Sequence, residues 1–183
     1  MLLIKHLTTT HSGHFALIWA RALGAEVYAI SHSPDKKDDA LRLGAHHFIS
    51  TAEKDWQKPY AFTFDFILNS ADMTHKFDLD AYMSTMKVMG RFHNVGLPDE
   101  PLPAMQAQQF MPGGYYIGAS HIGNREEMEA MLKLASEKNL KGDIETRNIS
   151  AETCKEVVEG VKHNKVRYRY TLVGFDEVFG KRA

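Results

Sequence analysis

Hydroxyl and imidazole side chains gather in one short stretch, Thr8-Thr9-Thr10-His11-Ser12, directly before Gly13. An apolar segment precedes this stretch and a helical pattern follows it, which is where a nucleotide-binding loop joins a strand to a helix. The dinucleotide fingerprint G-x-G-x-x-G would need glycine at positions 8, 10 and 13, and only Gly13 is present. If the other two positions need positive φ, threonine there adds strain of about 1–3 kcal/mol.

Two interpretations of this loop stay open. The hydroxyls of Thr8, Thr10 and Ser12, together with the free N–H groups of the helix N-terminus, offer a seat for a phosphate. Alternatively, the same side chains form a polar cap on a helix and bind no ligand.

A second group of polar residues follows the next apolar segment, in "ISHSPDKKDD". Dinucleotide folds that take NAD place an acidic residue at this point, whereas those that take NADP accommodate a 2′-phosphate with basic residues. Ser31, His32 and Lys36 are of the second kind, and Lys36 lies one helical turn inside the following helix. The alternative is a solvated helix start in which Lys36 only balances the neighbouring aspartates.

Alternating apolar strands and helices must position these groups. We expect strands at 2–7, 27–30, 47–50, 64–69, 90–95, 115–119, 144–146 and 166–173, and helices at 13–23, 35–43, 79–86, 125–138 and 151–162. This alternation predicts an α/β fold, a doubly wound parallel sheet with helices on both faces. We expect one domain over 1–183, and the methionines Met105, Met128 and Met131 pack in its core or loops.

Composition narrows the function classes. The 183 residues carry a net charge of −1, so no basic field is present to gather nucleic acid. Cys154 is the only cysteine, which excludes a disulfide within the chain and a cysteine-rich zinc site. We see no transmembrane-length apolar run and no signal peptide, and we therefore expect a cytoplasmic protein without membrane partners.

Longer motifs carry a family resemblance. They are "GHFALIWARALGAEVYAISHSPDKKDDALRLGAHHFIST", "FDFILNSA", "MKVMGRFHNVGLPDEPLP", "GGYYIGASHIGNREEMEAMLKLASEKNLKGDIE" and "GVKHNKVRYRYTLVGFD". In this order they resemble the cofactor domain of the zinc-dependent medium-chain alcohol dehydrogenases, particularly fungal NADP-dependent members of the cinnamyl alcohol dehydrogenase branch. The resemblance runs from Gly13 to about Asp176 and fades before Gly13, so residues 1–12 are either a diverged first strand or unrelated sequence.

The resemblance implies a Rossmann fold that prefers NADP(H). It places Ser12, Gly13 and His14 beside the pyrophosphate, and Ser31, His32 and Lys36 at the adenosine 2′-phosphate. It further places Asn69 and Ser70 beside the adenosine, and Val95, Gly96 and Ser120 near the nicotinamide. His32 stands where relatives often have arginine, which weakens the phosphate contact at neutral pH because histidine is mostly uncharged there.

The resemblance also implies a partner domain that this sequence does not match. Full-length relatives carry an N-terminal catalytic domain that supplies the zinc ligands, so we expect no zinc and no catalytic residue here, with binding of NADP(H) weakened by the altered loop. Three hypotheses follow: a cofactor-binding protein that acts only with a catalytic domain supplied separately, a pseudoenzyme or interaction module with little cofactor affinity, and a fragment that is inactive alone.

Two segments are expected to make contacts beyond the domain. In the family the strand corresponding to Tyr115–Ala119 pairs with its copy in a second subunit, which implies a homodimer through this apolar, uncharged edge. The tail, 166–183, would contact the catalytic domain in full-length relatives. With none matched here, we expect the apolar side of "VRYRYTLVGF" to repack or to bind another molecule.

Overall fold

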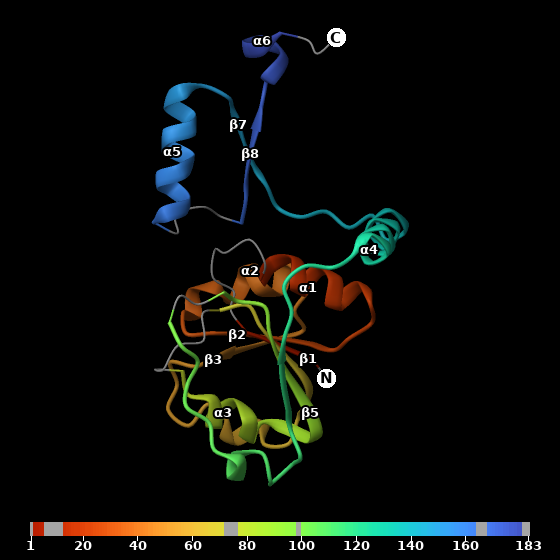
Figure 1. The fold of residues 1–183 in the computed structure, drawn as a ribbon, viewed down its shortest axis with the longest axis vertical. Helices are drawn as coiled ribbons and strands as arrows, with labels where there is room; N and C mark the ends of the chain where they lie inside the picture. The colour runs from red at the N-terminus through yellow and green to blue at the C-terminus, as the bar shows by residue number, and fades with distance from the viewer. Residues whose placement is uncertain (1, 6–12, 72–76, 98–99, 164–167, 181–183) are drawn as a thin grey trace.

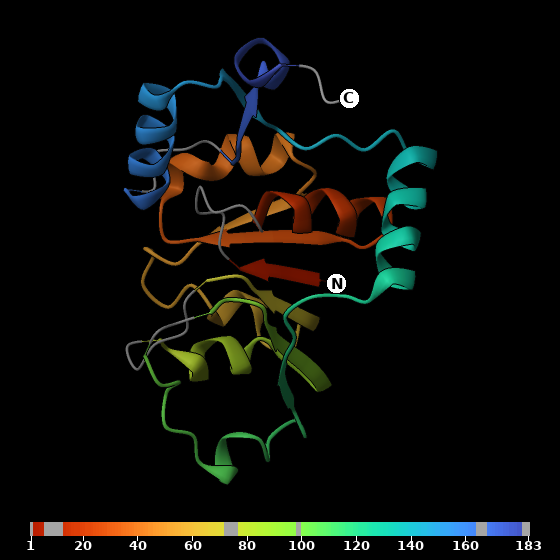
Figure 2. The same cartoon turned by 45° about the horizontal axis from the view of Figure 1, so that its top comes forward.

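A six-stranded parallel sheet forms the centre of the protein (Figures 1 and 2). The computed structural model describes residues 2–5, 13–71, 77–97, 100–163 and 168–180. The sheet strands are β1 (Leu2–Lys5), β2 (Val27–Ser31), β3 (His47–Ser50), β4 (Phe64–Asn69), β5 (Met86–Asn94) and β6 (Tyr116–Ala119). Their order in space is β3-β2-β1-β4-β5-β6, so the chain reverses its direction of winding between β1 and β4. This order confirms the predicted doubly wound α/β fold.

Helices cover both faces of the sheet (Figures 1 and 2). Helix α1 (Gly13–Ala22) and helix α2 (Lys37–Arg42), which continues a 3₁₀ turn at Pro34–Lys36, lie on one face. Helix α3 (Leu79–Ser84) lies on the other. This placement follows from right-handed crossovers between parallel strands, which put the helices before and after the reversal on opposite faces.

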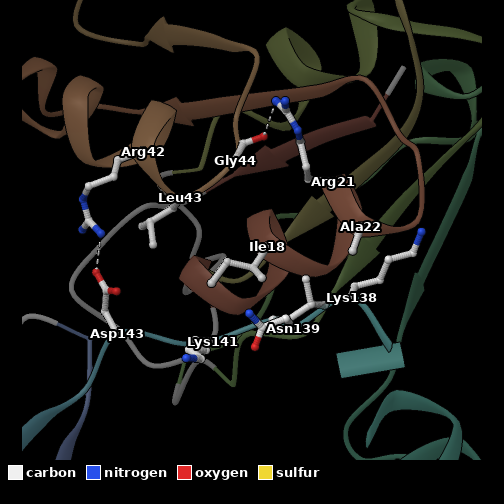
Figure 3. Close-up of a pocket in the computed structure, with 11 residues that line it drawn as sticks. Ile18, Arg21, Ala22, Arg42, Leu43, Gly44, Lys138, Asn139, Lys141 and Asp143 are labelled. Carbon is white, nitrogen blue, oxygen red and sulfur yellow. Dashed lines mark hydrogen bonds and ion pairs between the residues drawn. The ribbon is translucent and has the colours of Figure 1, made fainter. Parts of the chain in front are cut away.

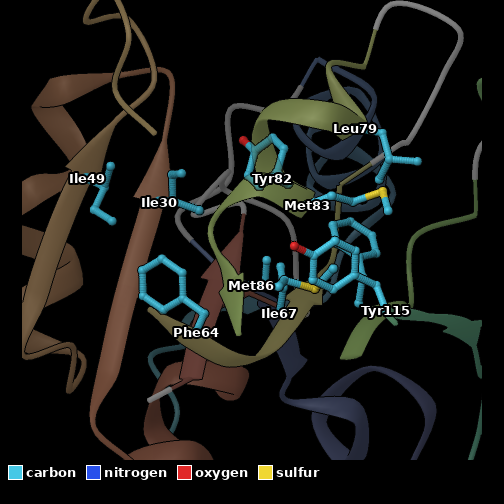
Figure 4. Packing of buried hydrophobic residues seen from close by; sticks show 10 residues of the cluster. Ile30, Ile49, Phe64, Ile67, Leu79, Tyr82, Met83, Met86 and Tyr115 are labelled. Carbon is cyan, nitrogen blue, oxygen red and sulfur yellow. The ribbon is translucent and has the colours of Figure 1, made fainter. Parts of the chain in front are cut away.

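Two apolar clusters fill the space between the sheet and these helices. The cluster on the α3 side contains Phe64, Ile67, Met86 and Phe92, each at most 1% exposed (Figure 4). The cluster on the α1 and α2 side consists of smaller side chains around Leu17, which is fully buried. Strands β2 and β4 are therefore largely buried between the two helical layers, as inner parallel strands usually are.

The chain beyond residue 120 forms a separate layer outside α1 and α2, which we call the C-terminal unit (121–163 and 168–180; Figure 1). It contains helix α4 (Arg125–Glu137), strand β7 (Glu145–Asn148), helix α5 (Ala151–Lys162), strand β8 (Tyr170–Val173) and helix α6 (Phe175–Phe179). Strands β7 and β8 pair in parallel as a second, two-stranded sheet.

Local sequence explains the longer helices of this unit. Asn124 and Glu127 form a reciprocal capping box at the start of α4, and the Ser150 hydroxyl accepts the Thr153 N–H at the start of α5. Neither helix has a buried residue. Their starts are thus fixed by capping and not by packing.

Three predicted features are wrong. Residue Met86, expected to end a helix, instead opens β5 four residues before the expected strand, because its backbone pairs with Phe64 of β4 and its side chain is fully buried. The terminal strand begins at Tyr170, since Tyr168 has a φ of +80°, which a strand does not allow. Two of the methionines expected to pack in the core or loops are instead exposed on α4, Met128 by 56% and Met131 by 41%, whereas Met105 lies on a loop and is 41% exposed.

The C-terminal unit is attached to the start of α1 and the end of α2. Tyr168 is 7% exposed, and its ring centroid lies 4.9 Å from that of His14. Gly142 lies so close to Phe15 that a Cβ there would be 2.5 Å from the ring. Arg42 of α2 forms an ion pair with Asp143, with 2.6 Å between Nη1 and Oδ2. Among the described residues, the start of the tail therefore packs against α1 at Tyr168.

Candidate functional site

The carboxyl ends of the six parallel strands meet at one edge of the sheet. In doubly wound folds ligands bind outside this edge, at the point where the strand order reverses. Most of the predicted cofactor residues lie there, at or just after the ends of β2, β4, β5 and β6, and two more begin α1: Ser31, His32, Asn69, Ser70, Val95, Gly96, Ser120, Gly13 and His14.

A buried ladder of amides joins the ends of β4 and β5. The Asn69 amide donates to Asn94 Oδ1 at 2.6 Å and to the Ala71 carbonyl at 2.9 Å. The Asn94 amide donates in turn to the Gly96 carbonyl at 2.9 Å, and the Val95 N–H donates to the Asn69 carbonyl. These bonds fix the backbone that leaves both strands at the edge.

The side-chain oxygen of Asn69 takes no part in these hydrogen bonds, because the side chain contributes only its amide nitrogen. Asn69 is fully buried, and its Oδ1 atom has no hydrogen-bond partner among the described residues. An unpaired buried acceptor costs about 1–3 kcal/mol, so it is a place where a ligand donor would be stabilising. Backbone register sets Asn69 beside Lys5 of β1, at the crevice where the winding reverses.

A second polar pair closes the edge at β5 and β6. His93 Nε2 and the Ser120 hydroxyl are 2.8 Å apart, and the Ser120 N–H donates to the Asn94 carbonyl. Ser120 is therefore held next to the amide ladder, although it follows β6 by a single residue and is exposed. The hydroxyl has one fixed partner and stays accessible.

The polar group after β2 lies at the opposite end of the same edge. Ser31 is buried, and its hydroxyl accepts the Ser33 N–H at 3.2 Å, whereas His32 is exposed. Partial burial lowers the pKa of the Lys36 ammonium, and the nearby Asp35 carboxylate offsets part of that shift. Lys36 has no ion pair within the part of the chain that the structure describes, so its charge is available to an anion.

The start of α1 is more enclosed than the sequence suggests. Gly13 is buried, and His14 is 1% exposed, with its ring 4.1 Å from Phe15 and 4.9 Å from Tyr168. The imidazole thus packs under the C-terminal unit, and of the described residues here the helix N-terminus is the group that can receive an anion. The loop residues Thr8, Thr10 and Ser12 lie outside the described residues.

Two residues of the edge were missed from the sequence, Asn94 and His93. Asn94 directly precedes the predicted Val95 and Gly96, and polar side chains at the last positions of a buried strand are a usable signal. Their pairing with Asn69 and Ser120 depends on which strands are neighbours, which one strand by itself does not reveal.

A cleft lies elsewhere, near the C-terminal ends of α1, α2 and α4 (Figure 3). It measures about 490 Å³ and includes Arg21, Arg42, Lys138 and Lys141, and none of the predicted cofactor residues. Arg21 donates to the Gly44 carbonyl and Arg42 pairs with Asp143. These cations lie where helix carbonyl ends are negative, which accounts for them without a ligand.

The described part of the chain contains neither a metal-binding cluster nor a membrane-spanning helix. Within 2–5, 13–71, 77–97, 100–163 and 168–180, no three histidine, cysteine or acidic side chains are grouped so as to hold a metal ion. A zinc ion therefore does not fit the described residues. Among the helices of these ranges, none has the length and apolar character needed to cross a bilayer.

Comparison with known proteins agrees with this geometry. The family model described as zinc-binding dehydrogenase matches residues 13–137. NADP-dependent alcohol dehydrogenase 6 of Saccharomyces cerevisiae is 34% identical over 168 residues, 91% of this chain and 46% of that protein. A probable formaldehyde dehydrogenase of Bacillus subtilis is 34% identical over 160 residues, 87% of this chain and 44% of that protein.

Solved structures show the same relation. A cinnamyl alcohol dehydrogenase from Sorghum bicolor superposes with a TM-score of 0.83 at 31% identity, over 93% of this chain and 47% of that one. The enzyme of the same name from Helicobacter pylori, solved as a complex with NADP(H), gives 0.76 at 25% identity, over 93% and 47%. The chain belongs to the zinc-binding dehydrogenase family and represents its cofactor-binding domain. It spans about half the length of the curated relatives it matches.

Proposed function

We propose that this chain binds NADP(H) at the carboxyl edge of its sheet, as the cofactor half of an alcohol dehydrogenase-type oxidoreductase. The observation that carries the proposal is the fully buried Asn69 Oδ1, which has no hydrogen-bond partner among the described residues and lies where the strand order reverses between β1 and β4. Ribose hydroxyls and amides of a dinucleotide are donors that would satisfy this acceptor. Relatives named for NADP dependence, and one solved with NADP(H), support the same choice of ligand.

In this proposal one half of the edge, formed by the residues after β4, β5 and β6, binds one part of the cofactor, and the other half, after β2 and at the start of α1, binds its phosphates. Asn69, Ser70, Val95, Gly96 and Ser120 border the ribose and nicotinamide portions, on a backbone that the amide ladder holds rigid. A rigid backbone lowers the entropic cost of orienting a bound cofactor.

The other half selects the phosphate. Ser31, His32 and Lys36 face the 2′-phosphate, while the α1 N-terminus at Gly13 and His14, with Ser12 before it, receives the pyrophosphate. No acidic residue follows β2 directly, so the site favours NADP(H) over NAD(H).

The bound cofactor would supply or accept a hydride; the described residues supply no metal ion to activate an alcohol or aldehyde. The chain is therefore proposed to be inactive alone and to act with a zinc-containing catalytic domain, on an alcohol or aldehyde as in the relatives named above. We further propose a cytoplasmic homodimer in which β6 pairs with its copy. Strand β6 ends the sheet, and Tyr116 on it is half exposed.

A second candidate is a pseudoenzyme that keeps the fold as an interaction module. The observation that favours it is threonine at positions 8 and 10, where the fingerprint has glycine. The first threonine adds a side chain where the fingerprint needs a tight turn, and the second where the backbone must approach the pyrophosphate; both changes would reduce cofactor affinity.

Calorimetric titration with NADPH and with NADH separates the two candidates. We expect NADPH to bind more tightly, and Lys36→Gln to weaken NADPH about tenfold or more while leaving NADH unchanged, since hydrogen bonds to charged groups contribute about 1.5–3 kcal/mol. Lys37→Gln is the matched control, because Lys37 is the exposed neighbour and should change neither affinity. Absence of binding by either cofactor at millimolar concentration would contradict the proposal and leave the pseudoenzyme.

A further inference from the structure

An apolar groove runs between α1 and α4, away from the cofactor edge. It measures about 630 Å³ and is lined by Phe15, Ala16 and Trp19 of α1, by Met131, Leu132 and Ala135 of α4, and by Arg169. Both helices contribute residues spaced one turn apart, so two apolar helix stripes face the same space. Neither the amide ladder nor the polar residues after β2 reach it.

The α4 wall of this groove is not covered by the rest of the described chain. Helix α4 has no buried residue, and Met131 and Leu132 are 41% and 57% exposed. When a ligand removes exposed apolar side chains from water, the free energy falls by about 25 cal/mol for each Å² of apolar surface that is buried. An occupant with an apolar body would therefore be stabilised here.

One charged group makes the two ends of the groove chemically different. The Trp19 ring lines the groove, whereas its indole N–H is buried and has no hydrogen-bond partner among the described residues. The Arg169 guanidinium lies 5.9 Å from the centre of the Phe15 ring. It forms no ion pair within the described ranges, and the groove lining contains no carboxylate.

The position of Arg169 is set by its neighbours. Tyr168 is packed against His14, which fixes the preceding backbone, and the Arg169 carbonyl accepts the Glu145 N–H at 2.8 Å. The cation is thus held at the Phe15 end of the groove, while Trp19 lies one turn further along α1. A cation without an ion pair among the described residues, at one end of an otherwise apolar groove, is complementary to an anion with an apolar body.

We propose that this groove binds a small organic carboxylate with an apolar chain, such as a medium-chain fatty acid. The carboxylate pairs with Arg169 and the chain lies along Phe15, Trp19, Met131 and Leu132. Carboxylate is favoured over a neutral or cationic head group because the lining carries one positive charge and no negative one.

Isothermal titration of the wild-type chain with decanoate, decanol and decyltrimethylammonium, each below its micellar concentration, tests the head-group preference. We expect saturable binding of decanoate, about tenfold or more weaker binding of decanol, and the weakest binding for the cation, from the strength of charge-assisted hydrogen bonds. Trp19 fluorescence in a Trp56→Phe background reports the place of binding, since the chain has two tryptophans.

Two variants give the specific control. Arg169→Gln should reduce decanoate affinity to that of decanol without changing decanol itself. Arg147→Gln should change neither, although Arg147 also lies over a ring, 5.5 Å from the centre of Tyr170, outside the groove. Equal affinity for decanoate and decanol, or equal effects of the two arginine variants, would overturn the proposal.

Sedimentation velocity supplies the remaining outcome. If no amphiphile binds and Leu132→Glu converts a dimer to monomers, the groove is an interface between copies of this chain and the carboxylate proposal is wrong. If the oligomeric state is the same with and without saturating decanoate while decanoate binds, the small-molecule site stands.

Discussion

The sheet body, comprising the described residues up to 119, and the C-terminal unit differ sharply in how they are held together. The body encloses two apolar clusters in which side chains such as Phe64 and Leu17 are fully buried. In the C-terminal unit Tyr168 is the only buried residue among those described, and helices α4, α5 and α6 bury none. The body is stabilised by burial, whereas the unit depends on helix caps, one short sheet and a few contacts with α1 and α2.

This difference in burial indicates that the sheet body suits a rigid ligand site, whereas the C-terminal unit offers surfaces for contacts with other molecules. The rigid body fixes the strand ends that form the proposed cofactor site, because buried strands do not shift without breaking their packing. The unit exposes apolar helix faces, and such surfaces commonly mark ligand or protein contacts. The same chain thus combines a rigid sheet edge, where the cofactor site is proposed, with apolar surfaces that stay exposed.

The largest expected effect on the free energy of unfolding comes from replacing a phenylalanine by alanine, once in the sheet body and once in the C-terminal unit. Phe64→Ala should lower the free energy of unfolding by about 3–5 kcal/mol, since it empties a fully buried site. Phe179→Ala, at a side chain that is 71% exposed, should change it by about 0.5 kcal/mol or less. Urea unfolding followed by circular dichroism measures both, and equal losses would show that the unit shares the stability of the body.

An intermediate effect is expected where the two regions touch. Gly142→Ala places a Cβ 2.5 Å from the Phe15 ring, and overpacking of this kind costs about 1–3 kcal/mol. We expect the cost to appear as faster amide exchange in β7, α5 and β8, with the strands of the body unchanged.

The control for that contact is Gly118→Ala. The new Cβ would lie 3.5 Å from His93 Nδ1, its nearest neighbour and an ordinary contact distance, so amide exchange should stay as in the wild type. Faster exchange throughout the body after the Gly142 change would mean that the unit is an integral part of the core.

The smallest effect is a pH dependence at Tyr168. Burial, then the hydrogen bond to Asp39 and its charge, raise the pKa of the Tyr168 phenol to about 12. The folded state therefore holds this proton more tightly than the unfolded chain, whose value is near 10. Its contribution to stability is complete below about pH 10 and is lost as the pH rises toward 12.

Comparison of wild type with Tyr168→Phe isolates this contribution. The difference in unfolding free energy between the two proteins should change between pH 9 and 12, with the wild type losing stability relative to the variant. Other buried tyrosines, such as Tyr82, titrate in both proteins and cancel. A difference that stays constant over this interval would place Tyr168 in solvent rather than against α1.

The sequence predicted the elements well wherever local signals suffice. Strand β4 was expected at 64–69 and helix α5 at 151–162, and both have these bounds in the structure. A short, mostly apolar run defines the first, and a capping serine with helical periodicity defines the second. For the candidate site, the strand ends that carry Asn69 and Ser120 were also placed correctly, because parallel strands bring their carboxyl ends together.

The sequence by itself thus determined the doubly wound fold and the family, since periodicity, caps and motifs are local properties. Tertiary structure alone decided the Asn69–Asn94 pairing, the early start of β5 at Met86 and the burial of His14 beneath Tyr168. It also left Met131 and Leu132 of α4 exposed beside Trp19, where the periodicity had indicated an inner face. The physical reason is the same in each case: these features depend on which distant segments become neighbours, and that is set by packing across the whole chain.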